Sequence, residues 1–217
     1  MAFTDMLLEL LTSFGVTFNI FIVTLIFSLP LGLIVAVGRM SKNKFISIPV
    51  SIYISIMRGT PLMLQLICVY FGPYYLFRIS PGTNYRMMAI YIAFAINYAA
   101  YFGEIFRSGI QSMPRGQYEA AQILGYTKLQ TFMRIILPQV IKRILPSVSN
   151  EVITLVKDTS FAFTLSVMDM FTMAKALAAG QTSVVPLFAA GVFYYIFNFI
   201  VAKIFDIFEY KLNYYRF

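Results

Sequence analysis

The sequence predicts an all-α membrane protein that crosses the bilayer five times, with the N-terminus outside and the C-terminus in the cytoplasm. Of its 217 residues, 59% are hydrophobic and 12% are charged, and the mean hydropathy is +0.77. Soluble domains carry about 25% charged residues, so a water-soluble globule of this composition would lack polar surface. Five apolar stretches are separated by loops of unequal charge. We interpret residues 1–217 as a single transmembrane domain.

Residues 1–11 lead into the first predicted span. They contain Asp5 and Glu9 but no Lys or Arg, so they lack the basic region with which a signal peptide begins. Their alternation of leucine and acidic residues favours a short interfacial helix that leads into the first span.

The spans follow from length, because a helix needs about 20 apolar residues to cross a bilayer core about 30 Å thick. The fourth is interrupted by Glu151, Lys157 and Asp158 but is otherwise apolar. The five predicted spans cover residues 10–38, 45–77, 87–105, 144–168 and 176–202.

The second span contains one charge, Arg58, followed by Pro61. Because proline removes a backbone donor, it should disturb the helix near Thr60. We expect Arg58 to lie near the cytoplasmic start of this span, with the freed carbonyls met by Arg58 or by a cavity.

The orientation follows from the basic residues, which concentrate in the cytoplasmic loops of membrane proteins. The side that holds the C-terminus has twelve: Arg39, Lys42, Lys44, Arg107, Arg115, Lys128, Arg134, Lys142, Arg143, Lys203, Lys211 and Arg216. The opposite side has three: Arg78, Arg86 and Lys175. The chain therefore ends in the cytoplasm.

Nearly all the non-membrane sequence of any size lies in one cytoplasmic loop, at about residues 108–142. Pro114 and Gly116 end the third helix. Residues 118–124 predict a short helix, for which Gly125 is a natural stop. A second amphipathic run follows, with one apolar face made by Leu129, Phe132, Met133 and Ile136. On pattern alone, these are two interfacial helices packed against the bundle.

The same loop resembles the EAA motif of ABC importer permeases, which reads EAA, three residues, Gly, nine residues, then I-x-L-P. The matching positions are Glu119, Ala120, Ala121, Gly125, Ile135, Leu137 and Pro138. The resemblance implies that the loop at about 111–138 contains coupling helices that insert into a cleft on an ATP-hydrolysing subunit. It also implies that Glu119, Ala120, Ala121 and Gly125 serve this coupling.

Two further stretches resemble signatures of the polar-amino-acid permeases within that family, the histidine, glutamine and arginine type. Residues 58–62 read RGTPL and residues 157–160 read KDTS. Residues 98–110 are similar to the segment that precedes the EAA loop in these permeases. Asn97 departs from the pattern, since a small residue or serine is more usual there.

Polar residues follow one face of the third span and one face of the fourth. The spacing of 4, 3 and 4 that places side chains on one helix face is shared by Asn97, Tyr101, Glu104 and Ser108 and by Ser147, Glu151, Thr154 and Asp158. Because ionisable groups inside a membrane are costly, such stripes face either a hydrophilic path or each other. Both interpretations stay open here.

A substrate site on these stripes would use Asn97, Tyr101, Glu104, Asp158, Thr159 and Ser160. The acidic surplus favours a cargo with a cationic side chain, and Glu104 is the candidate to receive it. An ion pair with Arg107, three residues further on, is the alternative role for Glu104.

These features predict a permease subunit of an ATP-driven, binding-protein-dependent importer of polar amino acids, located in the cell membrane and working by alternating access. The sequence contains no phosphate-binding GxxxxGK[ST] loop, so ATP and Mg would be bound by a partner ATPase and the chain itself is not an enzyme. With no His and one Cys, it also offers no usual metal site. The expected partners are a dimer of ATP-binding subunits, a second permease, an extracytoplasmic solute-binding protein and membrane lipid, with no nucleic acid. The alternative is a secondary transporter or channel subunit for a small polar solute.

Overall fold

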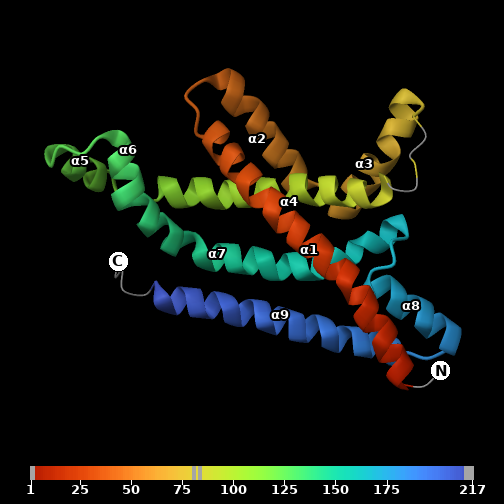
Figure 1. Cartoon of the computed structure of the whole chain (residues 1–217). Coiled ribbons are helices and arrows are strands. Elements are labelled where there is room, and N and C mark those ends of the chain that lie inside the picture. Colours follow the sequence, from red (N-terminus) through yellow and green to blue (C-terminus); the bar gives the residue numbers. More distant parts are fainter. Residues whose placement is uncertain (1–2, 80–81, 83–84, 213–217) are drawn as a thin grey trace.

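The computed structural model describes residues 3–79, 82 and 85–212, which form helices joined by short connections (Figure 1). No part of the described chain forms a strand. The helices are α1 (Phe3–Arg39), α2 (Lys44–Gly59), α3 (Leu62–Phe77), α4 (Tyr85–Gln111), α5 (Arg115–Ile123), α6 (Lys128–Thr131), α7 (Leu137–Asp158), α8 (Met170–Gln181) and α9 (Val185–Lys211). Two shorter segments continue α6 and α7: the π-helix η1 (Phe132–Ile136) and the 3₁₀-helix η2 (Thr159–Leu165). The all-α membrane fold predicted from the sequence is confirmed.

Three helices, α1, α4 and α9, are each long and apolar enough to cross a membrane. Two bent pairs pass the same test together: α2 with α3, bent by 112°, and the α6–η2 segment with α8, bent by 60°. The described chain therefore has three spans, or up to five if each bent pair counts as one.

The predicted short helix at residues 1–11 is wrong, because α1 runs without a break from Phe3 to Arg39. Met6 and Leu10 are buried in a small apolar cluster with Met170 and Ala174 of α8. One face of this first part of α1 therefore packs against α8 within the bundle.

The second predicted span is two helices, and Arg58 lies in the last turn of α2, not near its start. Thr60 adopts an extended backbone, as expected for the residue before a proline. Pro61 then caps α3 at its N-terminus. The chain turns here because Thr60 and Pro61 together cannot continue the helix.

The predicted last span at 176–202 is also displaced. Residues 176–181 belong to α8, which ends where Thr182 adopts a left-handed backbone with φ of 49°. The last helix begins at Val185 and continues to Lys211. Hydropathy did not indicate this boundary, because Thr182 and Ser183 interrupt the apolar run without adding charge.

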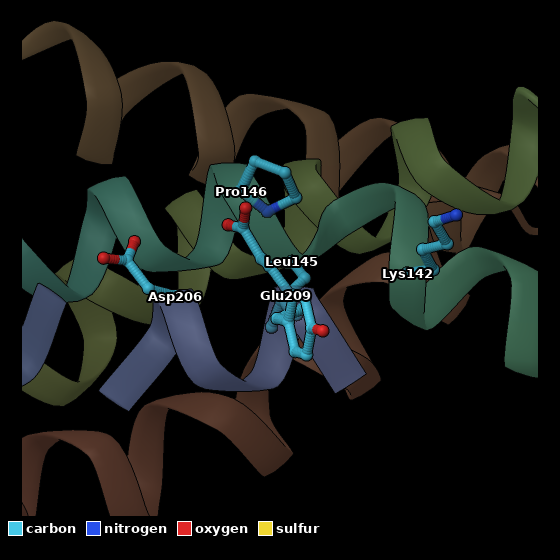
Figure 2. A pocket seen from close by; sticks show the side chains of 6 residues that line it. Lys142, Leu145, Pro146, Asp206 and Glu209 are labelled. Carbon is cyan, nitrogen blue, oxygen red and sulfur yellow. The ribbon is translucent and has the colours of Figure 1, made fainter. Parts of the chain in front are cut away.

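Figure 1 places the α5–α6 segment and the C-terminal end of α9 at one end of the molecule, and the start of α1, the end of α3 and all of α8 at the other. Helices α7 and α9 pack side by side and run antiparallel. Near the end of α9 they enclose a cavity of about 360 Å³ (Figure 2). Its lining residues are Lys142, Leu145, Pro146, Asp206, Glu209 and Tyr210.

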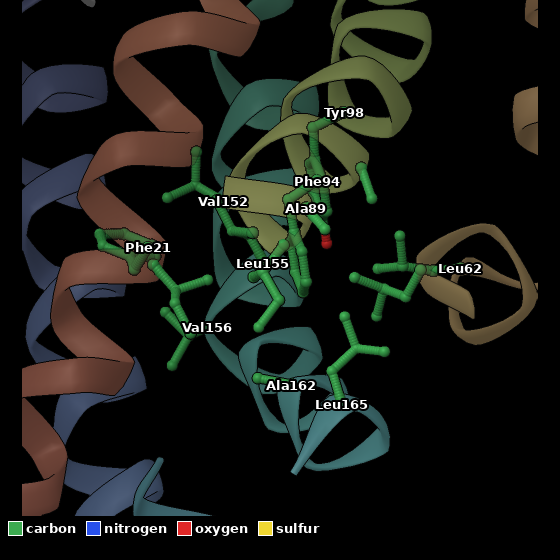
Figure 3. Packing of buried hydrophobic residues seen from close by; sticks show 14 of the residues in the cluster. Phe21, Leu62, Ala89, Phe94, Tyr98, Val152, Leu155, Val156, Ala162 and Leu165 are labelled. Atoms are coloured by element: carbon green, nitrogen blue, oxygen red, sulfur yellow. The ribbon is translucent and has the colours of Figure 1, made fainter. Parts of the chain in front are cut away.

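The largest apolar core surrounds α4 (Figure 3). Phe94 and Tyr98 of α4 are buried there against Leu155 and Val156 of α7 and Leu62 of α3. This packing places α4, α7 and the α2–α3 break next to one another.

Two glycines let α1 and α4 cross closely. A β-carbon on Gly103 would lie 2.6 Å from Val35 Cγ1 and 3.2 Å from the Gly32 carbonyl oxygen. A β-carbon on Gly32 would lie 2.8 Å from Phe102 Cβ. Small residues at such positions allow membrane helices to approach until their backbones are in contact.

Candidate functional site

A polar cavity of about 230 Å³ lies where α4, α7 and the α2–α3 break meet. Its lining residues are Thr60, Pro61, Leu62, Asn97, Tyr98, Tyr101, Glu151, Thr154, Asp158 and Phe161. We call this the carboxylate cavity, because two acidic side chains reach it from one face of α7.

The two carboxylates differ in how they are held. Asp158 accepts a hydrogen bond of 2.8 Å from the Tyr98 hydroxyl at Oδ2, and Tyr98 is fully buried. Glu151 lies seven residues earlier on α7, half-buried, and within electrostatic range of Asp158 and Arg58. Tyr98 therefore fixes one carboxylate in place.

A cation stands beside this acidic pair. The Arg58 guanidinium lies 5.3 Å from the centroid of the Tyr101 ring, a distance at which a cation is attracted to the face of an aromatic ring. The cavity therefore offers acceptors for an ammonium group, and Arg58, which is exposed and outside the cavity lining, is a nearby donor for a carboxylate.

Three of the residues predicted from the sequence line the carboxylate cavity: Asn97, Tyr101 and Asp158. Asn97 is 4% exposed, and its Nδ2 donates to the Met57 carbonyl at 3.1 Å and to Gln65 Oε1 at 2.9 Å. The hydrogens of this amide are thus used within the protein, which leaves Oδ1 as the atom that can face a ligand.

The other three predicted residues lie outside the cavity lining. Glu104 forms an ion pair with Arg107, which also donates to Gln111. The hydroxyls of Thr159 and Ser160 donate to backbone carbonyls three residues earlier, at 2.7 Å and 2.8 Å. Ser160 lines a separate cavity of about 220 Å³ with Lys157, Phe171 and Tyr194.

Some lining residues were missing from the predicted site. Glu151 and Thr154 belong to the polar stripe of the fourth span, so the helical spacing did indicate their position. Tyr98 and Phe161 gave no signal, because a single aromatic residue in an apolar helix is indistinguishable from core. Thr60 and Pro61 stood in the RGTPL stretch but were interpreted only as a helix break.

The loop between α4 and α7 folds as two short helices joined by a tight turn at Gly125. The Tyr126 amide donates to the Ala121 carbonyl at 3.0 Å and the Gly125 amide to the Gln122 carbonyl at 3.0 Å, which is the Schellman pattern of a helix end. Gly125 has φ of 77°, in the left-handed region that favours glycine. Thr127 then caps α6 through reciprocal hydrogen bonds with Gln130.

This loop is fastened to the ends of α4 and α7. The side-chain amides of Gln117 and Gln139 donate to each other, at 2.8 Å and 2.6 Å. Arg143 of α7 donates to the Ser112 carbonyl at 3.1 Å. A small apolar cluster centred on Met113, Ile136 and Val140 fills the space between them. The loop is thus a folded unit attached to two helices of the cavity wall.

Large apolar side chains remain exposed on the outer surface of the loop. These side chains are Ile123 at 86%, Leu124 at 73%, Leu129 at 71% and Met133 at 54% of their surface. Glu119, Ala120 and Gly125 are exposed as well, whereas Ala121 is buried against the turn. An exposed apolar group of this kind marks an interaction surface.

The family model of the inner membrane component of binding-protein-dependent transport systems matches residues 28–214. The chain belongs to this family. It is therefore a membrane permease subunit of an ABC importer and an inner membrane protein, as the EAA resemblance implied.

Relatives of this permease include the octopine transport system permease protein of Rhizobium radiobacter, which is 38% identical over 203 residues, with 86% of this chain and 80% of the relative covered. The L-cystine transport system permease protein of Bacillus subtilis is 37% identical, and the match covers 92% of this chain and 84% of the relative. The putative glutamine transport system permease protein of Rickettsia felis is 34% identical, with 91% and 89% covered.

Solved structures are similar over nearly the whole chain. A crystal structure of an amino acid ABC transporter with histidines matches with a TM-score of 0.86 and 29% identity, covering 97% of this permease and 99% of that chain. An inward-facing structure of the MetNI methionine ABC transporter matches at 0.73 and 17% identity, over 98% and 99%, which supports the fold alone.

Proposed function

We propose that this permease forms half of the membrane path of an ATP-driven importer of polar amino acids, and that it favours those with a cationic side chain. The observation that carries the proposal is the carboxylate cavity, where Glu151 and Asp158 share a polar space with Asn97 and Tyr101. Ionisable groups at membrane depth are expensive and typically mark a transport path. The relatives named for octopine, glutamine and cystine transport, and the related amino acid transporter structure, support a polar amino acid as the cargo; the cationic preference rests on the cavity alone.

In this proposal the cationic side chain of the cargo lies near Glu151, and the α-ammonium of the cargo lies near Asp158, which Tyr98 holds in place. Asn97 Oδ1 accepts a hydrogen bond and Tyr101 provides a ring face. Arg58 faces the cargo carboxylate. Thr159 and Ser160 support the end of α7 through backbone contacts, and Glu104 stabilises the inner end of α4 through Arg107.

The remaining subunits follow from the family and from the loop. A dimer of ATP-binding subunits, which bind ATP and Mg, receives residues 111–138 through Glu119, Ala120, Ala121, Gly125 and the exposed apolar surface. A second permease completes the path, and a solute-binding protein delivers cargo on the outer side. ATP-driven closure of the ATP-binding subunits then switches the path between an opening to the outside and an opening to the cytoplasm. The whole of residues 1–217 acts as one transmembrane domain with five spans, the N-terminus outside and the C-terminus in the cytoplasm.

The cargo preference is tested by replacing Glu151 with glutamine in proteoliposomes that contain saturating binding protein. A hydrogen bond to a charged group contributes about 1.5–3 kcal/mol, so the half-saturating concentration for lysine or arginine should rise about tenfold or more. That for glutamine should change little, because a neutral side chain does not need the carboxylate. Equal losses for both cargoes would contradict the preference.

Glu104→Gln is the matched control on α4. Since Glu104 pairs with Arg107 outside the cavity lining, we expect it to affect lysine and glutamine transport to the same extent. A selective loss for lysine would instead place Glu104, and not Glu151, at the cationic end of the cargo. The measurement is initial uptake rate against cargo concentration for both amino acids.

A further inference from the structure

The break between α2 and α3 exposes backbone carbonyls that no helix can satisfy. The last carbonyls of any helix lack partners within it, and the α2–α3 turn lies inside a pair of helices that together match a membrane span. In an apolar environment each unsatisfied carbonyl costs several kcal/mol. The side chains that supply donors at this break therefore decide whether it holds its shape.

One side-chain amide lies within hydrogen-bonding distance of two of these carbonyls, and the Thr60 hydroxyl donates to a third, that of Ile56, at 2.8 Å. Gln65 Nε2 lies 3.0 Å from the Met57 carbonyl, 3.2 Å from the Thr60 carbonyl and 2.8 Å from the Thr60 hydroxyl oxygen. The sequence had suggested Arg58 or an open cavity for this role. The structure shows that a residue one turn into α3 reaches back across the bend instead.

The same amide also connects the break to α4. Asn97 Nδ2 donates to Gln65 Oε1 at 2.9 Å and to the Met57 carbonyl at 3.1 Å. Residues of α2, α3 and α4 thus meet in one hydrogen-bonded network. Within it, Gln65 both donates to the break and accepts from the helix that forms the opposite side of the carboxylate cavity.

Gln65 itself does not line that cavity, whereas Thr60, Pro61 and Asn97 do. We propose that Gln65 is a positioning residue: it fixes Thr60 and Pro61 against Asn97, and so sets the shape of the proposed cargo site. The inference rests on that proposed site for its effect on cargo, but the shape of the break can be measured without cargo.

The test compares Gln65→Met, which has similar length and no amide, with Gln65→Glu, which keeps the shape and the acceptor oxygens but loses the donor. The assembled importer is placed in nanodiscs without binding protein, and binding of labelled arginine is measured. Loss of hydrogen bonds worth about 1 kcal/mol each should weaken binding about tenfold in both variants. Unchanged binding in Gln65→Glu would overturn the role of the donor.

The labelling rate of an introduced cysteine reports directly on the conformation of the α2–α3 break. Cys68 is the single cysteine of the sequence, so Cys68→Ala gives a cysteine-free background. Gly59→Cys then adds a side chain where a β-carbon meets nothing within 4 Å. Without cargo, we expect Gln65→Met and Gln65→Glu to change the rate of labelling at position 59 by about threefold or more.

The outcomes separate the two proposals. A changed labelling rate with no arginine binding, even when Gln65 is intact, would support the positioning role and contradict the cargo class. An unchanged labelling rate in both variants would overturn the positioning role whatever the cargo. Failure of both variants to assemble would show that Gln65 is needed for folding, and would overturn it as well.

Discussion

Replacing Gly125 with valine is expected to abolish cargo-stimulated ATP hydrolysis by the assembled importer, while the permease still inserts and folds. Gly125 has φ of 77°, and a β-branched side chain is strongly disfavoured there. The Schellman turn that joins α5 to α6 would have to open, which would displace the exposed apolar side chains of the loop. The measurement is ATPase activity with and without loaded binding protein, alongside the yield of the assembled complex.

Gly125→Asn is the matched control. Asparagine tolerates the left-handed region better than any β-branched residue, so this variant should retain most of the stimulation. If the asparagine and valine variants were equally inactive, glycine would be needed at position 125 because a side chain clashes with the ATPase, and not because of the backbone conformation. Normal coupled turnover in Gly125→Val would contradict the coupling role of the turn.

Replacing Gly103 with valine is expected to prevent α1 and α4 from packing, so that little folded permease is recovered. Even a single β-carbon at Gly103 would lie 2.6 Å from Val35 and 3.2 Å from the backbone of Gly32. Overpacking of this kind costs about 1–3 kcal/mol, and valine adds two further carbons that have no space. The measurement is the monodisperse fraction after extraction and its midpoint of thermal denaturation.

Gly103→Ala and Gly15→Ala form the graded comparison. The alanine at 103 should lower the denaturation midpoint by about 5 °C. A β-carbon at Gly15 of α1 meets nothing within 4 Å, so alanine there should raise the midpoint slightly, because alanine is favoured over glycine inside a helix. Equal midpoints for the two alanine variants would show that α1 and α4 can move apart at Gly103 with little loss of stability.

Much of the fold was predictable because membrane helices are specified by local composition. The apolar stretches and the turn at Gly125 could be read from residues close in sequence. The prediction was wrong where two helices share one apolar run. The break at Pro61 and the α8–α9 boundary at Thr182 are set by single residues that leave the hydropathy unchanged.

The site was predictable only in part, for a related reason. Helical spacing indicated Asn97, Tyr101 and Asp158, because polar residues stand out in apolar helices. It indicated Arg107 as a partner for Glu104, but it could not show that Tyr98 binds Asp158 or that Glu104 lies outside the cavity lining. Those two placements depend on how the helices rotate against one another, which is determined by close contacts such as that between Gly103 and Val35.

The loop between α4 and α7 is stiff, and its stiffness has a mechanical consequence. The hydrogen bonds between Gln117 and Gln139 and the apolar cluster around Ile136 allow α5 little movement relative to α4 and α7. A force applied to α5 is therefore transmitted through the loop to the attached helices. We expect it to act as a torque on α4 and α7 together, so that the walls bearing Tyr98 and Asp158 tilt as one body and draw the α2–α3 break with them through the hydrogen bonds of Asn97.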